Sequence, residues 1–81
     1  MTQAETIASL QQIFDDLFMD KVILTPELTA GEVEEWDSLT QISLMLAVEK
    51  RFNVRFRVGE VEKTRNVGEL ADLIARRAGG G

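Results

Sequence analysis

Apolar residues recur at three- and four-residue spacing in the first part of the chain and indicate an amphipathic helix over about residues 3–19. Thr2 and Glu5 stand three residues apart at its start. This is the spacing of a capping box, in which each side chain satisfies a backbone N–H of the first turn. The apolar face consists of Ile7, Leu10, Ile13, Phe14, Leu17 and Phe18.

Two more apolar patterns predict helices further along the chain. One begins at Asp37-Ser38, ends at Asn53 and has an unusually broad apolar surface: Leu39, Ile42, Leu44, Met45, Leu46, Val48 and Phe52. The other covers about residues 67–78, after Asn66 and Glu69 at capping-box spacing. Arg76 and Arg77 fall in its last turn, where the helix dipole favours cations. We expect Phe14, Leu17, Phe52, Leu70 and Ile74 to meet in one core.

The segments between these patterns have no sustained period. Residues 20–37 contain Thr25-Pro26 and a Gly31 break, and so predict a long loop. A loop of this length in a small domain needs its own anchors. The candidates are Val22, Leu24, Leu28, Val33 and Trp36. Residues 59–63 leave room for about one helical turn. The expected fold is therefore all-α: a four-helix bundle with three main helices, a short third helix and a long first loop.

Length and composition limit the function classes. With 81 residues and 44% hydrophobic content, the chain predicts one soluble domain over residues 1–78 and a flexible glycine tail over residues 79–81. Cysteine and histidine are both absent, which excludes disulfides and thiolate catalysis and argues against Ser-His chemistry and zinc. Asp15, Asp16 and Asp20 do not follow the calcium-loop pattern, so no metal site is expected. The chain is expected to be a monomer that is not an enzyme on its own.

Charge and hydropathy bear on partners and location. The net charge is −5, with nine acids and one base in residues 1–37 and five acids and eight bases in residues 38–81. An acidic front half argues against nucleic acid, because phosphate binding relies on Lys and Arg. The first residues do not form a signal peptide, and no stretch approaches the roughly 18 apolar residues of a membrane span. We expect a cytoplasmic protein with neither nucleic acid nor membrane as partner.

The strongest candidate for chemistry is Ser38, in the sequence Glu35-Trp36-Asp37-Ser38-Leu39. A hydroxyl at this place lies beside unpaired backbone N–H groups and the positive end of a helix, which favour a phosphodiester. The alternative is that Ser38 only caps the helix, since Ser38 and Gln41 also have capping-box spacing. For Asp37, a role as N-cap or as a favourable charge at the helix dipole is weighed equally with a role in the site, and both can coexist. Trp36 is interpreted as a loop anchor rather than a ligand contact.

From Trp36 through Ile74, and more loosely from Ile7, the chain resembles the acyl carrier protein family. Asp37-Ser38-Leu39 matches the motif that opens the family's second helix, and Ala47-Val48-Glu49-Lys50-Arg51-Phe52 follows at the family's spacing. The resemblance implies that Ser38 receives 4'-phosphopantetheine from coenzyme A, and that the thiol of this arm carries an acyl group as a thioester. It also implies that Asp37 and Leu39 help to form the attachment site, with Asp37 engaging the modifying transferase and its metal.

The resemblance further implies the partners. These are a phosphopantetheinyl transferase, a loading enzyme (an acyltransferase or an adenylate-forming ligase), and a ketosynthase or other acyl-processing enzyme of fatty-acid, polyketide or other natural-product biosynthesis. By family position Leu39, Ile42, Leu46 and Glu49 face partners, while Leu44, Met45, Val48 and Phe52 face the core. Thr40, Ser43 and Lys50 stand where fatty-acid carriers have an acid-rich surface, which weakens complementarity to basic partners and favours different cognate enzymes. The sequence Trp36-Asp37-Ser38-Leu39 resembles that of discrete carriers of specialised pathways.

Three alternatives stay open at the level of sequence. The cargo could be an aminoacyl or small hydroxyacyl unit. The chain could instead be an unmodified helical interaction domain in which Ser38 is a cap. All seven apolar residues of the second helix could also lie in the core. Modification of Ser38 would distinguish a carrier, whatever its cargo, from an unmodified interaction domain.

Overall fold

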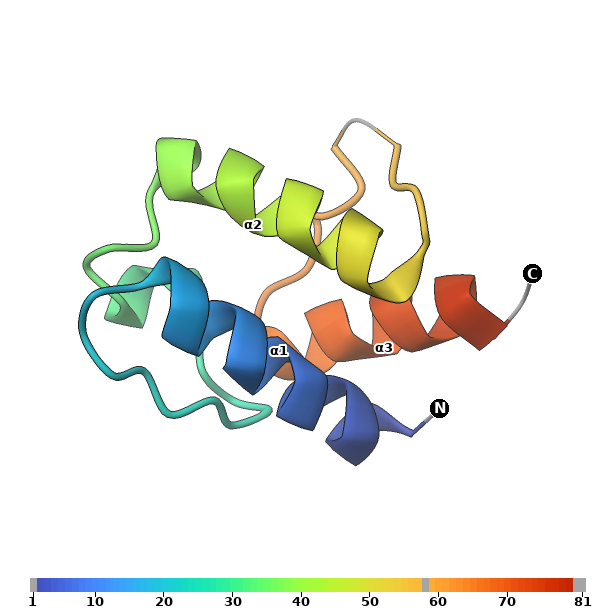
Figure 1. The fold of residues 1–81 in the computed structure, drawn as a ribbon, viewed down its shortest axis with the longest axis horizontal. Coiled ribbons are helices and arrows are strands. Elements are labelled where there is room, and N and C mark those ends of the chain that lie inside the picture. The colour runs from blue at the N-terminus through green and yellow to red at the C-terminus, as the bar shows by residue number, and fades with distance from the viewer. Residues whose placement is uncertain (1, 58, 80–81) are drawn as a thin grey trace.

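The computed structural model describes residues 2–57 and 59–79. It contains three α-helices and one short 3₁₀ helix: α1 (Gln3–Leu17), η1 (Ala30–Glu32), α2 (Ser38–Phe52) and α3 (Val67–Gly79). α1 packs against both α2 and α3, and the long loop after α1 returns along the bundle to the start of α2 (Figure 1). The all-α expectation is confirmed. Within the described ranges, no helix is long and apolar enough to cross a membrane.

The described residues 59–63 do not form the short third helix expected there. Residues 59–63 form consecutive turns, so the described part of the chain has three α-helices instead of the four expected. Gly59 has a φ of 84°, which is outside the right-handed helical region. The carbonyl oxygen of Val61 accepts both the backbone N–H of Thr64, at 3.0 Å, and its hydroxyl, at 2.6 Å. These two bonds close a turn at Thr64, shortly before α3 begins at Val67.

The predicted helix ends are correct to within one or two residues. The Thr2–Glu5 capping box is formed, and α1 ends at Leu17 because Phe18 is extended and turns its ring into the core. Asn53 closes α2 in the left-handed conformation, with a φ of 55°. α3 continues through Gly79, the first residue of the expected tail, and the other two tail residues lie outside the described ranges.

The capping box expected at the start of α3 is only half formed. Asn66 Oδ1 accepts the N–H of Glu69 at 2.9 Å, as the spacing predicts. The Glu69 carboxylate accepts the N–H of Arg65 at 2.8 Å instead of that of Asn66. The bond from Glu69 therefore holds the residue before the cap.

The core joins all three helices. Phe14, Leu70 and Ile74 are buried as predicted, and Leu44 and Val48 are the fully buried residues of α2. Leu17 and Phe52 are partly buried and pack against this core, as expected from their facing. Phe52 is the last residue of α2, where the helix reaches the edge of the bundle. The alternative that all seven apolar residues of α2 lie in the core is wrong, because Leu39, Ile42 and Leu46 are exposed.

The long loop is anchored by the apolar residues that the sequence indicates. Leu24 is buried, and Val22, Leu28, Val33 and Trp36 pack partly buried against the core. Polar contacts that the sequence pattern does not reveal add to these. Gln11 of α1 accepts the N–H of Leu24 at 2.9 Å and donates to the carbonyl of Val22 at 2.6 Å. The loop is thus held along its length rather than only at its ends.

The same loop satisfies the free N–H groups at the start of α3. Val67 N–H donates to Leu28 O at 2.8 Å, and Gly68 N–H donates to Pro26 O at 2.9 Å. The lack of a side chain at Gly68 favours this close approach. A Cβ at position 68 would lie 3.0 Å from the carbonyl oxygen of Pro26.

Candidate functional site

The segment that leads into α2 is anchored by Trp36. Its ring meets Phe14 edge-on, with 5.1 Å between ring centroids, and its indole N–H donates to the side-chain oxygen of Gln41 on α2. The aromatic contact ties the segment to α1, and the hydrogen bond ties it to α2. Trp36 is therefore a structural anchor, as the sequence predicts.

Glu35 adds a second tie that sequence reasoning missed. Its two carboxylate oxygens accept the N–H of Met19 at 3.1 Å and that of Asp20 at 3.0 Å. These donors follow the end of α1, some 15 residues away in sequence. Glu35 thus fastens the end of α1 to the segment just before α2. No local signal identifies this contact, because its partners are distant in sequence.

Asp37 caps α2. Its Oδ1 accepts the N–H of Thr40 at 2.9 Å, and its backbone is extended. The hydrogen bond from the backbone of Thr40 lowers the pKa of Asp37 from its ordinary value of 3.8. The helix therefore begins with an ionised carboxylate at neutral pH.

Because Asp37 is the cap, the alternative that Ser38 caps the helix is wrong. Ser38 is the first residue of α2 and is exposed. Its hydroxyl is thus available for another role at the N-terminal end of a 15-residue helix. Leu39, the next residue, lies with 77% of its surface exposed.

Ser38 lines an open groove of about 420 Å³ between α2 and the turns that precede α3. The side of the groove near α2 has Trp36, Asp37, Ser38 and Gln41, and η1 contributes Ala30. The opposite side consists of Val61, Glu62, Thr64, Arg65 and Asn66. Asp37 and Ser38 therefore share one site, whereas Leu39 is not among the residues that line it. The exposed hydroxyl and the open groove leave space for a group attached at Ser38.

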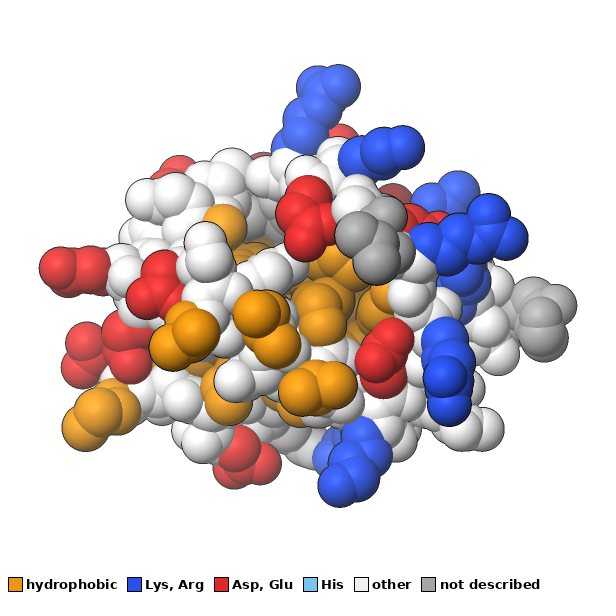
Figure 2. All heavy atoms as spheres, turned by 90° about the horizontal axis from the view of Figure 1, so that it is seen from above, with side chains coloured by type: hydrophobic (Ala, Val, Ile, Leu, Met, Phe, Trp, Pro, Cys, Tyr) orange, Lys and Arg blue, Asp and Glu red, His pale blue; other side chains and the backbone are white. Residues whose placement is uncertain are grey.

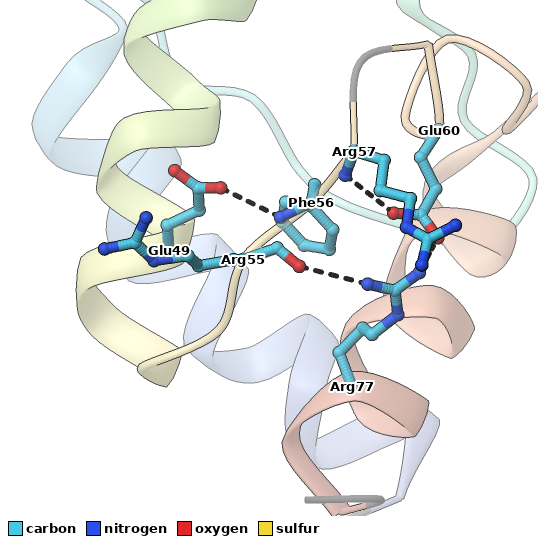
Figure 3. A network of polar contacts seen from close by, with 6 residues as sticks. All are labelled: Glu49, Arg55, Phe56, Arg57, Glu60 and Arg77. Carbon is cyan, nitrogen blue, oxygen red and sulfur yellow. Dashed lines mark hydrogen bonds and ion pairs between the residues drawn. The ribbon is translucent and has the colours of Figure 1, made fainter.

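A polar network holds the turns that form the far side of this groove (Figure 3). Arg77 of α3 forms an ion pair with Glu60 and donates to the carbonyl of Arg55 at 3.1 Å. Glu60 also accepts the N–H of Arg57 at 2.9 Å. Arg77 thus lies in the last turn of α3, where the helix dipole favours a cation as predicted, and also has a specific partner in Glu60.

The outer surface of α2 is apolar. Leu39, Ile42 and Leu46 are 77%, 60% and 62% exposed. Figure 2, which views the molecule from the α2 side, shows hydrophobic side chains gathered on this face. We call these three residues the α2 apolar face. Glu49 is half-buried, and one of its oxygens accepts the N–H of Phe56 at 2.9 Å (Figure 3), so part of this carboxylate serves the fold.

Comparison with known proteins agrees with this geometry. The family described as phosphopantetheine attachment site matches residues 35–74, which include the cap, Ser38 and the far side of the groove. An acyl carrier protein of Thermosynechococcus vestitus is 32% identical over 75 residues, covering 91% of this chain and 93% of the relative. One from Syntrophobacter fumaroxidans is 33% identical over 64 residues, covering 79% of each chain.

A solved structure shows the same fold. The solution NMR structure of a holo acyl carrier protein from Geobacter metallireducens matches with a TM-score of 0.84 and 36% identity, covering 93% of this chain and 87% of that one. The matched domain and the fold together define a phosphopantetheine-dependent carrier. The chain belongs to the acyl carrier protein family. The predicted cofactor, 4'-phosphopantetheine, is confirmed at the level of the domain.

Proposed function

We propose that Ser38 carries the 4'-phosphopantetheine group and that the chain delivers a biosynthetic intermediate, held on this group as a thioester, to partner enzymes. The observation that carries the proposal is the exposure of Ser38 as the first residue of α2, directly after the Asp37 cap and at the edge of the open groove. The attached group would supply the thiol that the chain lacks, since it contains no cysteine.

The attachment step requires an exposed hydroxyl oxygen. The Ser38 Oγ forms a bond to the β-phosphorus of coenzyme A while the phosphoanhydride bond breaks, and adenosine 3',5'-bisphosphate leaves with that bond's electron pair. The hydroxyl proton passes to a base on the phosphopantetheinyl transferase. Asp37 keeps the first turn of α2 in place through its bond to Thr40. Its negative charge, next to Ser38, also suits engagement of the transferase's metal ion.

We propose the α2 apolar face as the docking surface for the enzymes that act on the carrier. Members of the family work with phosphopantetheinyl transferases and acyl-processing enzymes. For this chain the proposed set is the transferase, a loading enzyme (an acyltransferase or an adenylate-forming ligase), and a ketosynthase or similar enzyme. Leu39, Ile42 and Leu46 would make apolar contacts, and Glu49 would add one charge at the edge. Catalysis would lie with these partners, and the carrier would act by bringing its cargo to high effective concentration.

The proposal is tested by incubating the protein with coenzyme A and a broad-specificity phosphopantetheinyl transferase. Intact mass should rise by one phosphopantetheinyl group. Ser38→Ala should lose this gain while its circular dichroism stays unchanged. Ser43→Ala, an exposed serine on the same helix, is the matched control and should keep the gain. Modification at Ser9 or Ser43 would contradict the proposed attachment residue. No modification with several transferases would contradict the proposal and favour an unmodified interaction domain.

A further inference from the structure

We propose that the guanidinium of Arg65 binds the phosphodiester of the group attached at Ser38, an inference that rests on the proposed attachment. Arg65 would then be a positioning residue, which holds the root of the arm in the groove. The argument depends on where Arg65 lies, how its backbone is fixed and what charges surround the groove.

Arg65 and Ser38 come from different elements and line the same groove. Ser38 opens α2, whereas Arg65 belongs to the turns just before α3. A phosphodiester on the Ser38 oxygen would be the first part of the arm to enter this space. A long, flexible arginine side chain on the opposite side of the groove suits it, because the guanidinium can donate two parallel hydrogen bonds to phosphate oxygens.

The backbone at Arg65 is held from both sides. Its N–H donates to the carboxylate of Glu69 at 2.8 Å, and the next residue, Asn66, caps α3. On the other side, Thr64 makes two bonds to the carbonyl of Val61. A fixed backbone reduces the conformational entropy lost when the side chain binds a ligand.

The charges in the groove favour the same assignment. Among the described residues that line it, two are acidic, Asp37 and Glu62, and Arg65 is the one cation. A phosphodiester at Ser38 would lie next to the Asp37 carboxylate, and a cation in the same groove offsets that repulsion. Arg77 and Arg51 have side-chain partners within the fold. Within residues 2–57 and 59–79, the structure shows no hydrogen bond or ion pair from the Arg65 guanidinium.

The test uses the holo protein and observes the arginine Nε–Hε groups by NMR, together with the ³¹P resonance of the phosphodiester. The Arg65 signal is assigned by its loss in Arg65→Gln. Conversion of the apo to the holo form should shift this signal, and added salt should reduce the shift, because the pair is exposed and screened. The ³¹P resonance should move in holo Arg65→Gln and less in Arg65→Lys. Arg57→Gln, an exposed arginine outside the groove, is the matched control and should leave it unchanged.

The outcomes separate this inference from the proposed function. Intact mass shows first whether Ser38 is modified, and failure there overturns the proposed function along with this inference. If Ser38 is modified but the Arg65 signal does not move, only this inference is overturned. A signal that moves with a malonyl cargo but not with the bare arm or an acetyl cargo would assign Arg65 to a cargo carboxylate and would also overturn it. Equal ³¹P changes in Arg65→Gln and Arg57→Gln would reduce the effect to general charge and contradict it.

Discussion

Asp37 shows how one side chain can serve both the fold and the site. As the cap of α2 it accepts the Thr40 N–H, and this bond favours the ionised form of the carboxylate. Ser38 next to it is thereby free of the capping role. The capping residue and the candidate attachment residue are neighbours, so the Asp37–Thr40 bond helps to fix the turn that carries Ser38.

The lowered pKa of Asp37 predicts a specific pH dependence of stability. A carboxyl whose folded pKa lies below its unfolded value, ordinarily 3.8, stabilises the fold above that value. The stabilisation is lost as the pH falls through the folded pKa. In Asp37→Asn, the side-chain oxygen still accepts the Thr40 N–H but does not titrate. Thermal unfolding between about pH 5 and pH 2 should therefore depend less on pH in this variant than in the wild type.

Glu5, whose pKa is also lowered by the backbone N–H of Thr2, provides a second variant for the same experiment. Glu5→Gln should independently reduce the loss of stability at low pH, because the start of α1 and the start of α2 lie at opposite ends of the molecule (Figure 1). An Asp37→Asn profile parallel to that of the wild type throughout this range would contradict the assigned role of Asp37.

Gly68 is a residue at which a substitution should lower the stability of the fold. In Gly68→Ala the new Cβ would meet the Pro26 carbonyl oxygen at 3.0 Å, which forces the loop away from the start of α3. We expect a loss of about 1–3 kcal/mol in the free energy of unfolding, measured by urea denaturation. Gly31→Ala is the matched control, because the nearest atom there is 4.0 Å away. It should change stability by no more than about 0.5 kcal/mol, and equal losses in the two variants would rule out the close approach as the cause.

At the scale of elements, α2 has two apolar faces with different roles. Leu44 is fully buried, and Leu46, two residues on, is 62% exposed. Leu44→Ala should lower the free energy of unfolding by about 2–5 kcal/mol, because it leaves a cavity between helices. Leu46→Ala should stay within about 0.5 kcal/mol. Chemical denaturation of the two variants measures these free energies and so tests which side of α2 faces the core. A larger loss of stability in Leu46→Ala than in Leu44→Ala would mean that α2 is rotated about its axis.

At the scale of the whole molecule, charge is unevenly distributed along the bundle. The acid-rich first half of the chain includes η1 and the start of α2, whereas Lys50, Arg51, Arg76 and Arg77 lie where α2 and α3 end. In Figure 2 the basic side chains lie toward one end of the molecule, whereas acidic side chains occur along its length and gather at the other end. The α2 apolar face lies between them. Partner enzymes that dock on this face would therefore meet few charges at its centre.

This arrangement predicts that docking depends more on apolar contacts than on charge. With the cognate loading enzyme, Ile42→Ala should slow loading more than Glu49→Gln, because a buried aliphatic anchor contributes about 1.5–3 kcal/mol and an exposed charge pair about 0–1. Gln at position 49 keeps an oxygen for the Phe56 N–H, so the change mainly removes charge. Loading rates at low and high salt provide the measurement. Greater damage from Glu49→Gln, with wild-type loading abolished by salt, would indicate an electrostatic mode instead.

The sequence by itself determines the features that arise within a few residues of one another. Apolar spacing predicted the three main helices, the Thr2–Glu5 pair and Asn53 predicted helix ends, and Asp37-Ser38-Leu39 marked the candidate site. Caps and periodicity are set by bonds and faces within about four residues, so they can be read from the order of the side chains.

Only the tertiary structure decided the contacts between distant segments. The roles of Gln11 and Glu35 depend on loop N–H groups brought to them by folding, and the preference for glycine at position 68 depends on the approach of Pro26. The turns in place of a third helix follow from the bonds of Thr64 to Val61, and Phe52 is half-buried because α2 ends at the edge of the bundle. Packing between elements fixes these features, and packing depends on which surfaces meet in three dimensions rather than on local sequence.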